Sequence, residues 1–198
     1  MRLISFESFM HNMKLSYDSH ARFYHTMEHV QDLMIKRYQW MATEGLSPCE
    51  STLFAIILHD YVYEAVRSDN EFRSAYWAGI WMTRLGLSTS LISQVNDMIM
   101  STEKHVPIRD DFETRMFLDL DLSILGSSPK VYDRYASNIR LEYAFVPSVD
   151  YYKRRNEILT RFLEKPSIYM TDYAREQWEC QARVNLQNEI KSNSTKVK

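Results

Sequence analysis

The chain has 198 residues, of which 24 are Lys or Arg and 26 are Asp or Glu, so its formal charge is −2, and 45% of its residues are hydrophobic. This length and composition predict a single globular domain, residues 1–198, with a core of its own. The near-neutral charge excludes a strong field for holding a nucleic-acid backbone, so we expect no sequence-specific nucleic-acid partner.

The sequence also argues against membrane insertion and secretion. The longest stretch without Asp, Glu, Lys or Arg is Leu85–Asn96, far shorter than the roughly 20 apolar residues of a membrane span. The segment Met1–Lys14 carries Glu7 and lacks a small-residue cleavage site, which is not typical of a signal peptide. Cys49 and Cys180 have neither the number of a disulfide framework nor the spacing of a metal site. We therefore expect a cytoplasmic protein with no membrane contact.

The chain is predicted to be all-α. Apolar residues recur at spacings of three and four along most of it, and most of the 4 Gly and 5 Pro fall at breaks between these segments. The predicted helices are Ile4–Met13, Tyr24–Thr43, Ser51–Glu64, Asn70–Leu85, Ser88–Ser101, Asp110–Leu125, Pro129–Phe145, Val149–Leu163 and Thr171–Ile190. Ser88 is a candidate N-cap, and the polar tail 191–198 is expected to fray.

Histidines and carboxylates in apolar surroundings are the main candidates for chemistry. His25 and His29 are four residues apart, so both imidazoles lie on one helix face if Tyr24 begins a helix. A single His is more often structural, but a pair on one face is a better ligand candidate. His59 and Asp60 directly follow the apolar run Leu53–Leu58. Burying an imidazole beside a carboxylate is costly unless they share a cation, which indicates a metal site.

Two further carboxylates, Asp119 and Asp121, interrupt the hydrophobic segment Phe117–Leu125. Their alternative partners are Arg115 and Lys130, in ordinary ion pairs. Together with the histidines, however, these carboxylates offer the mixture of nitrogen and oxygen ligands that suits Mn, Fe, Co, Ni or Zn.

This order of a helix-borne His, a His-Asp pair and a later Asp resembles the HD superfamily of metal-dependent phosphohydrolases. More narrowly, the chain is similar to the small family of predicted metal-dependent HD phosphohydrolases over about residues 17–190. The motifs that carry the resemblance are Arg22–His29, Leu58–Glu64, Asp69–Ala75, Ser101–His105, Phe117–Gly126, Asn138–Tyr143 and Glu179–Leu186.

The resemblance implies a single all-helical HD domain with its metal site among the central helices. It implies one divalent ion (Mn, Mg, Co, Ni, Fe or Zn) held by four side chains, among them His29, His59 and Asp60. The fourth ligand is Asp121 or Asp119; Asp121 is favoured because of the apolar residues that flank the last Asp of the superfamily. His25 is then the general acid.

The resemblance also suggests how a phosphate ester or anhydride would be bound and cleaved. Metal-activated water attacks phosphorus, with Asp60, Glu64 or Glu71 as the orienting carboxylate or base. The candidate phosphate contacts are Arg22, Arg73, Lys104 and His105, of which His105 is also a candidate ligand for a second metal. The simpler alternatives are that Glu64 or Glu71 pairs with Arg67 or Arg73, and that Lys104 is a solvated helix end. Arg140, Glu142, Tyr143, Arg155, Arg183 and Asn185 match family positions and are interpreted as buried polar bracing.

We therefore expect a hydrolase acting on a small phosphorylated substrate, most simply a nucleotide. Two alternatives stay open: a di-iron HD oxygenase, for which His105 is the spare ligand, and a non-catalytic HD module that binds a nucleotide and signals to a partner. Metal content separates the three. The aromatic segment Tyr76–Trp81 fits either a core or a homodimer interface.

Overall fold

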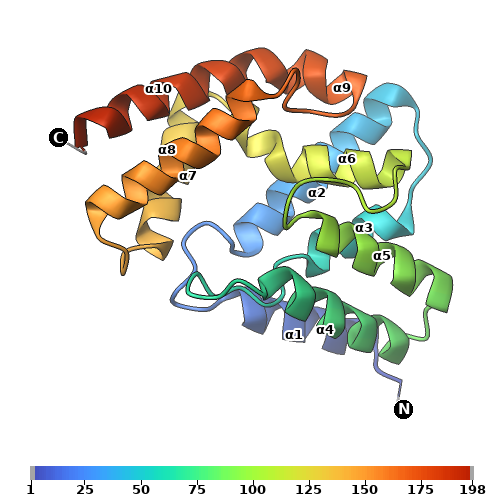
Figure 1. Cartoon of the computed structure of the whole chain (residues 1–198). Coiled ribbons are helices and arrows are strands. Elements are labelled where there is room, and N and C mark those ends of the chain that lie inside the picture. The colour runs from blue at the N-terminus through green and yellow to red at the C-terminus, as the bar shows by residue number, and fades with distance from the viewer. Residues whose placement is uncertain (1–2, 197–198) are drawn as a thin grey trace. The chain divides into compact units, whose positions relative to one another are not determined.

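The computed structural model describes residues 3–196, and within this range every regular element is a helix, which confirms the all-α prediction (Figure 1). The elements are α1 (Phe6–Tyr17), α2 (Met27–Glu44), α3 (Glu50–Leu58), α4 (Asn70–Arg84), α5 (Thr89–Ser101), α6 (Phe112–Asp121), the 3-10 helix η1 (Leu122–Gly126), α7 (Pro129–Glu142), α8 (Ser148–Glu164), α9 (Asp172–Ala174), the π-helical turn η2 (Arg175–Glu179) and α10 (Cys180–Lys196). In the described part of the chain, no helix is long and apolar enough to cross a membrane.

The chain divides between Asp121 and Leu122 into two compact units. The first unit contains α1 to α6, and the second contains η1 to α10. A single domain spanning both units stays a prediction, and each unit is described by itself below.

Helix α3 is the centre of the first unit. It contacts α2, α4, α5 and α6 (Figure 1). Seven of its nine residues are buried, among them the apolar stretch Phe54–Leu58. A helix that is apolar on every side needs neighbours on every side, which explains why this segment shows no polar face. The carboxyl end of α3 therefore delivers His59 and Asp60 into the interior of the unit.

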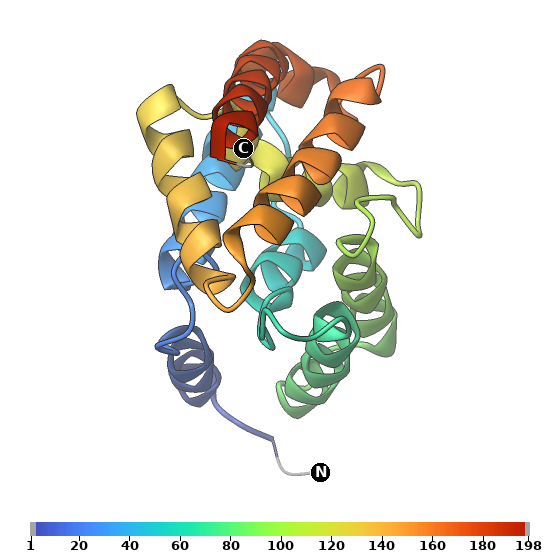
Figure 2. The ribbon, with the colours of Figure 1, turned by 60° about the vertical axis from the view of Figure 1, so that its left-hand side comes forward.

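Large rings fill the space around α3. The Phe9 ring of α1 lies 6.3 Å from that of Phe54 and 6.2 Å from that of Trp81, between centroids. Helices α4 and α5 pack side by side (Figures 1 and 2). At the start of α5, the Ser88 side chain accepts a hydrogen bond from Leu91 N, which confirms the predicted N-cap. In the aromatic segment of α4, Trp81 is buried whereas Tyr76 is exposed.

Two predicted helix boundaries near the candidate site are wrong. Helix α2 begins at Met27, three residues later than predicted, because Thr26 has an extended N-cap backbone. Helix α3 ends at Leu58 rather than Glu64, and residues 59–69 form turns before α4.

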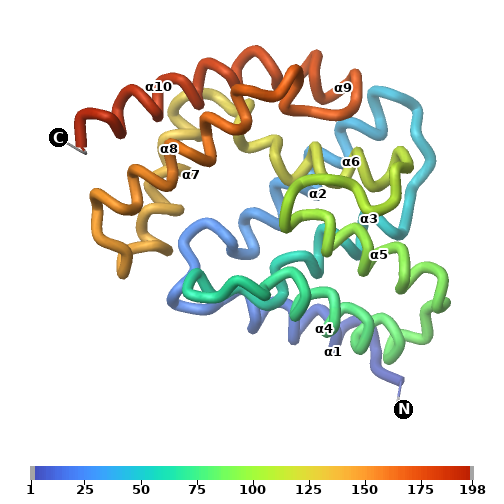
Figure 3. Tube along the Cα trace, in the orientation of Figure 1, coloured from blue at the N-terminus to red at the C-terminus, as the bar shows by residue number. Residues whose placement is uncertain are grey.

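The predicted helix over residues 110–125 is divided into α6 and the tighter helix η1. Figure 3 shows the long connection from α5 to α6 that carries the Ser101–His105 motif.

In the second unit, α7 and α8 diverge from the turn that joins them, and α10 lies at their open side (Figure 2). Helix α10 packs along α8. The prediction of a frayed tail from residue 191 is wrong, because α10 continues to Lys196. Asn193 in this last part is buried and donates a hydrogen bond to Asn156 at 3.1 Å. Residues 197–198 lie outside the described range.

Polar side chains brace the second unit, as the sequence predicted for several of them. Arg155 donates to Glu189 at 2.8 Å, and Tyr132 donates to the same carboxylate at 2.5 Å. Asn185 donates to the carbonyl oxygens of Leu125 and Ser127, each at 2.8 Å. These bonds tie α10 to α7, α8 and η1.

Candidate metal centre

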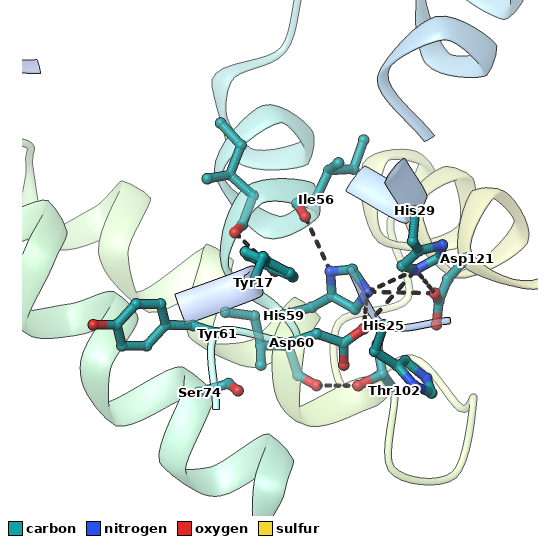
Figure 4. Close-up of polar contacts among 12 residues, drawn as sticks. Tyr17, His25, His29, Ile56, His59, Asp60, Tyr61, Ser74, Thr102 and Asp121 are labelled. Carbon is teal, nitrogen blue, oxygen red and sulfur yellow. Dashed lines mark hydrogen bonds and ion pairs between the residues drawn. The ribbon is translucent and has the colours of Figure 1, made fainter. Parts of the chain in front are cut away.

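Three side chains from distant parts of the first unit converge at the end of α3. His29, His59 and Asp121 each offer a ligand atom, and these atoms all lie within 4.8 Å of one another. The two imidazole Nε2 atoms are 3.2 Å apart. Asp121 Oδ1 lies 3.4 Å from Nε2 of His29 and 3.5 Å from Nε2 of His59 (Figure 4). Both histidines are buried, so the group is an interior cluster that could hold a metal ion.

Asp60 is the fourth side chain at this cluster. Its Oδ2 atom lies 3.0 Å from His59 Nε2 and 3.9 Å from His29 Nε2. The structure thus brings together the four residues predicted as ligands, and it places Asp121 rather than Asp119 in the group. Asp119 is buried, two residues earlier on α6.

A backbone carbonyl fixes the orientation of the His59 ring on the side away from the cluster. Its Nδ1 atom lies 3.0 Å from the carbonyl oxygen of Ile56. A carbonyl can only accept, so Nδ1 carries a proton and donates it. In the neutral imidazole this leaves the lone pair on Nε2, which faces His29 and the carboxylates. A backbone carbonyl behind the ring is the usual support of a metal-bound histidine.

Burial and the nearby carboxylates act in opposite directions on the two imidazoles. Burial lowers the pKa of His29, against the opposing influence of Asp121. Burial also disfavours charge on His59, but attraction to Asp60 and Asp121 outweighs it and raises the pKa of His59 well above its ordinary value. The two facing imidazoles therefore differ in their environment, because burial dominates at His29 and the two carboxylates dominate at His59.

Both carboxylates favour the charged form. Burial opposes ionisation of Asp60, yet the nearby charges of His59 and His25 hold its pKa below the ordinary value. Burial likewise opposes ionisation of Asp121, but hydrogen bonds from His105, His29 and His59 hold its pKa well below the ordinary value. Two partly buried carboxylates and two imidazole nitrogens form a donor set that fits a divalent ion such as Mn, Fe, Co, Ni or Zn.

His105 approaches the cluster from the connection after α5. Its Nε2 atom lies 3.3 Å from Asp121 Oδ2, and its backbone has a φ of 49°. A left-handed conformation is uncommon for a residue with a Cβ and persists where the surroundings hold it in place. His105 therefore contacts a predicted ligand, and its side chain is partly exposed.

His25 is not on the helix that carries His29, so the prediction that both share a helix face is wrong. It lies in the bend before the N-cap Thr26. Its ring stacks on Tyr63, with centroids 3.9 Å apart and an interplanar angle of 27°, and lies 6.2 Å from the His29 ring. Stacking on Tyr63, rather than helical register, sets the position of His25.

Arg22 holds the loops of the site together. It is 8% exposed, and its terminal nitrogens donate to the carbonyl oxygens of His25 at 3.1 Å, Asp60 at 2.6 Å and Tyr61 at 3.0 Å. Its guanidinium also lies over the Tyr63 ring, 5.7 Å from the centroid. We therefore interpret Arg22 as a brace between the two loops that carry His25 and Asp60, and its contact with a phosphate stays a prediction.

The other predicted contacts divide into exposed and site-facing residues. Glu64 and Arg73 form a partly exposed ion pair at 3.3 Å, the simpler alternative raised by the sequence. Lys104 is exposed beyond the end of α5. Glu71 is half-buried, and burial raises its pKa, with the nearby charges of Asp60 and Glu103 acting in the same direction. The charge of the cluster thus contributes, through Asp60, to the raised pKa of Glu71.

Several residues that shape the site were not predicted. Tyr17 is buried and donates from its hydroxyl to the Ile57 carbonyl at 3.0 Å, two residues before His59. Ser74 binds both backbone groups of Val62, at 3.0 and 3.1 Å. These bonds join side chains to backbone atoms 12 or more positions away, and no local sequence pattern marks such pairs.

Comparisons with protein-family models, with curated proteins and with solved structures found no match.

Proposed function

We propose that this chain is a metal-dependent phosphohydrolase of the HD type, acting on a phosphate ester or anhydride of a small molecule, most simply a nucleotide. The observation that carries the proposal is the pair of buried Nε2 atoms 3.2 Å apart, flanked by Asp60 and Asp121. Facing nitrogens at this distance need a proton or a cation between them, and the neighbouring carboxylates favour a cation.

The residues suited to hold a divalent ion are His29, His59, Asp60 and Asp121. A bound ion of this kind supplies Lewis-acid polarisation of a phosphoryl oxygen and lowers the pKa of a water molecule. The ring nitrogen of His59 is aligned for this role by the Ile56 carbonyl. The order of the motifs, similar to that of the HD superfamily, supports the same assignment.

Proton transfer falls to two residues beside the ligand set. His25, held against Tyr63, is the candidate donor of a proton to the leaving oxygen. Glu71 has a raised pKa because of its burial and the charge of Asp60, so it is the candidate carboxylate for accepting and returning a proton. His105 is the candidate donor of a hydrogen bond to a phosphoryl oxygen, because its ring is partly exposed beside Asp121.

The test is phosphate release from a panel of nucleotides with Mn, Mg, Co and Ni added separately. We expect release by the wild-type chain and none by His59→Ala. His25→Gln is expected to keep its metal and to lose turnover by about 10²–10⁴-fold, as for a missing general acid.

The matched control is His11→Gln, which alters an exposed imidazole on α1 and should leave turnover unchanged. Turnover in His25→Gln equal to that of the control would exclude His25 as the acid. Absence of release from every nucleotide by a metal-loaded wild-type chain would contradict the nucleotide assignment.

A further inference from the structure

The second unit contains a pocket among α7, α8 and α10 that shares no residue with the candidate metal centre. Its volume is about 640 Å³, within the range of roughly 300–1,000 Å³ typical of small-molecule sites. It occupies the region where α7 and α8 diverge and α10 lies at their open side (Figure 2). Its lining includes Ser137, Leu141, Tyr151, Tyr152, Asn188 and Lys196.

The charges of this pocket favour an anion. Its charged lining residues are Asp133, Arg140, Glu189 and Lys196. The carboxylate of Glu189 is already neutralised, because Arg155 donates to it at 2.8 Å and 3.1 Å. Two cations then remain in the lining with one carboxylate, so the pocket has an excess of positive charge. Arg140 contributes its charge while donating to the carbonyl oxygens of Tyr143 at 2.6 Å and Val146 at 3.1 Å.

A buried hydroxyl in the lining lacks a partner. Tyr151 is 7% exposed, and its hydroxyl makes no hydrogen bond within the part of the chain that the structure describes. Burial raises the pKa of Tyr151 to about 12, so the hydroxyl keeps its proton at neutral pH and remains a donor. Because buried polar groups almost always have a partner, this donor points to an acceptor supplied from outside the chain.

The remaining lining suits an organic molecule larger than a bare ion. The Tyr152 ring and the Leu141 side chain offer apolar surface, and Lys196 Nζ lies 4.8 Å from the centroid of the Tyr152 ring. Asn188 and Ser192 add neutral polar groups along α10. Apolar surface, neutral polar groups and cations together match a molecule with a ring, hydroxyls and a negatively charged group.

We propose that this pocket binds a small organic phosphate that carries a ring, of the size of a nucleoside monophosphate, with the phosphate near Arg140 and Lys196 and an oxygen accepting from Tyr151. The site is distinct from the hydrolytic site proposed above and needs no metal.

Calorimetric titration of the whole chain, in the presence of a chelator, tests this binding. The probes are adenosine monophosphate, adenosine and inorganic phosphate. We expect one molecule of the monophosphate to bind per chain, and the other two probes to bind at least about tenfold more weakly. Lys196→Gln should weaken binding by on the order of tenfold, and Tyr151→Phe by several-fold, without a loss of stability because no bond within the chain is lost.

The matched control is Lys191→Gln, because Lys191 is exposed on the same helix and does not line the pocket. Its affinity should equal that of the wild type. An absence of binding at millimolar concentration, equal affinity for inorganic phosphate, or unchanged affinity in both pocket variants would overturn the proposal. The Asp121→Asn variant should still bind the monophosphate under these conditions. Loss of binding in that variant would indicate that the monophosphate binds at the metal centre instead.

Discussion

Replacing Arg22 by Met tests how the two loops of the candidate metal centre are held. The change keeps an unbranched aliphatic stem but removes the donors that bind the carbonyl oxygens of His25, Asp60 and Tyr61. A hydrogen bond involving a charged group contributes about 1.5–3 kcal/mol. The contributions of three bonds that share one guanidinium are less than additive, so we expect the free energy of unfolding to fall by about 3–5 kcal/mol.

Urea unfolding of the wild type and the variant measures this loss. Arg67→Met is the control, because Arg67 makes only an exposed ion pair with Asp69, and its replacement should change stability little. A loss in Arg22→Met no larger than that in Arg67→Met would refute the interpretation of Arg22 as a brace.

The same variant should affect metal binding even where it remains folded. Arg22 positions Asp60 through its backbone, and loss of a residue that supports a ligand typically weakens metal affinity by about 10–100-fold. A residue that served only to contact a phosphate would leave metal affinity unchanged, so equilibrium dialysis of the folded variant distinguishes the two roles.

Two further predictions concern the packing of the chain and its pH dependence. A Cβ on Gly126 would lie 2.8 Å from Trp178 Cα, so Gly126→Ala should destabilise the protein by about 1–3 kcal/mol. A Cβ on Gly79 would meet Asn96 at an ordinary 3.5 Å, so Gly79→Ala should stabilise the protein by about 0.5–1 kcal/mol. Equal thermal midpoints of the two variants would contradict this reasoning. Burial opposes ionisation of Glu189, but Arg155 lowers its pKa below the ordinary 4.5, so its stabilisation is complete above pH 4.5 and is lost as the pH falls through the lowered value. Glu189→Gln should therefore flatten the dependence of stability on pH below 4.5, and an unchanged slope in chemical unfolding measured across that range would contradict it.

The sequence predicted most helices because burial imposes a periodic pattern on each of them. The apolar run before His59 indicated a helix buried on all sides, and α3 has that position. The same reasoning indicated a cation beside His59 and Asp60, since a charge at the end of such a helix needs a partner, whereas the set of four ligands was implied by the resemblance. Asp121 was predicted over Asp119 by resemblance, and the structure places Asp121 beside both histidines.

The parts that were predicted wrongly depend on contacts between distant residues. A helix from Tyr24 was expected, but α2 begins at Met27 after the N-cap Thr26, and the His25 ring stacks on Tyr63, which is 38 residues away. The sequence also did not indicate that Arg22 donates to the backbone carbonyls of Asp60 and Tyr61, and its contact with a phosphate stays a prediction. The polar tail gave no sign that Asn193 is buried against Asn156.

Metal content, measured on the wild type and on Asp121→Asn and Asp119→Asn, tests the proposed metal centre most directly. The two substitutions remove the same charge from positions two residues apart on α6, so a difference between them distinguishes a ligand in the cluster from a general effect on the helix. We predict one divalent ion per wild-type chain, retention of that ion in Asp119→Asn and an affinity more than about 100-fold weaker in Asp121→Asn. Two irons per chain would instead favour an oxygenase, and an ion retained in Asp121→Asn but lost in Asp119→Asn would contradict the metal centre described here.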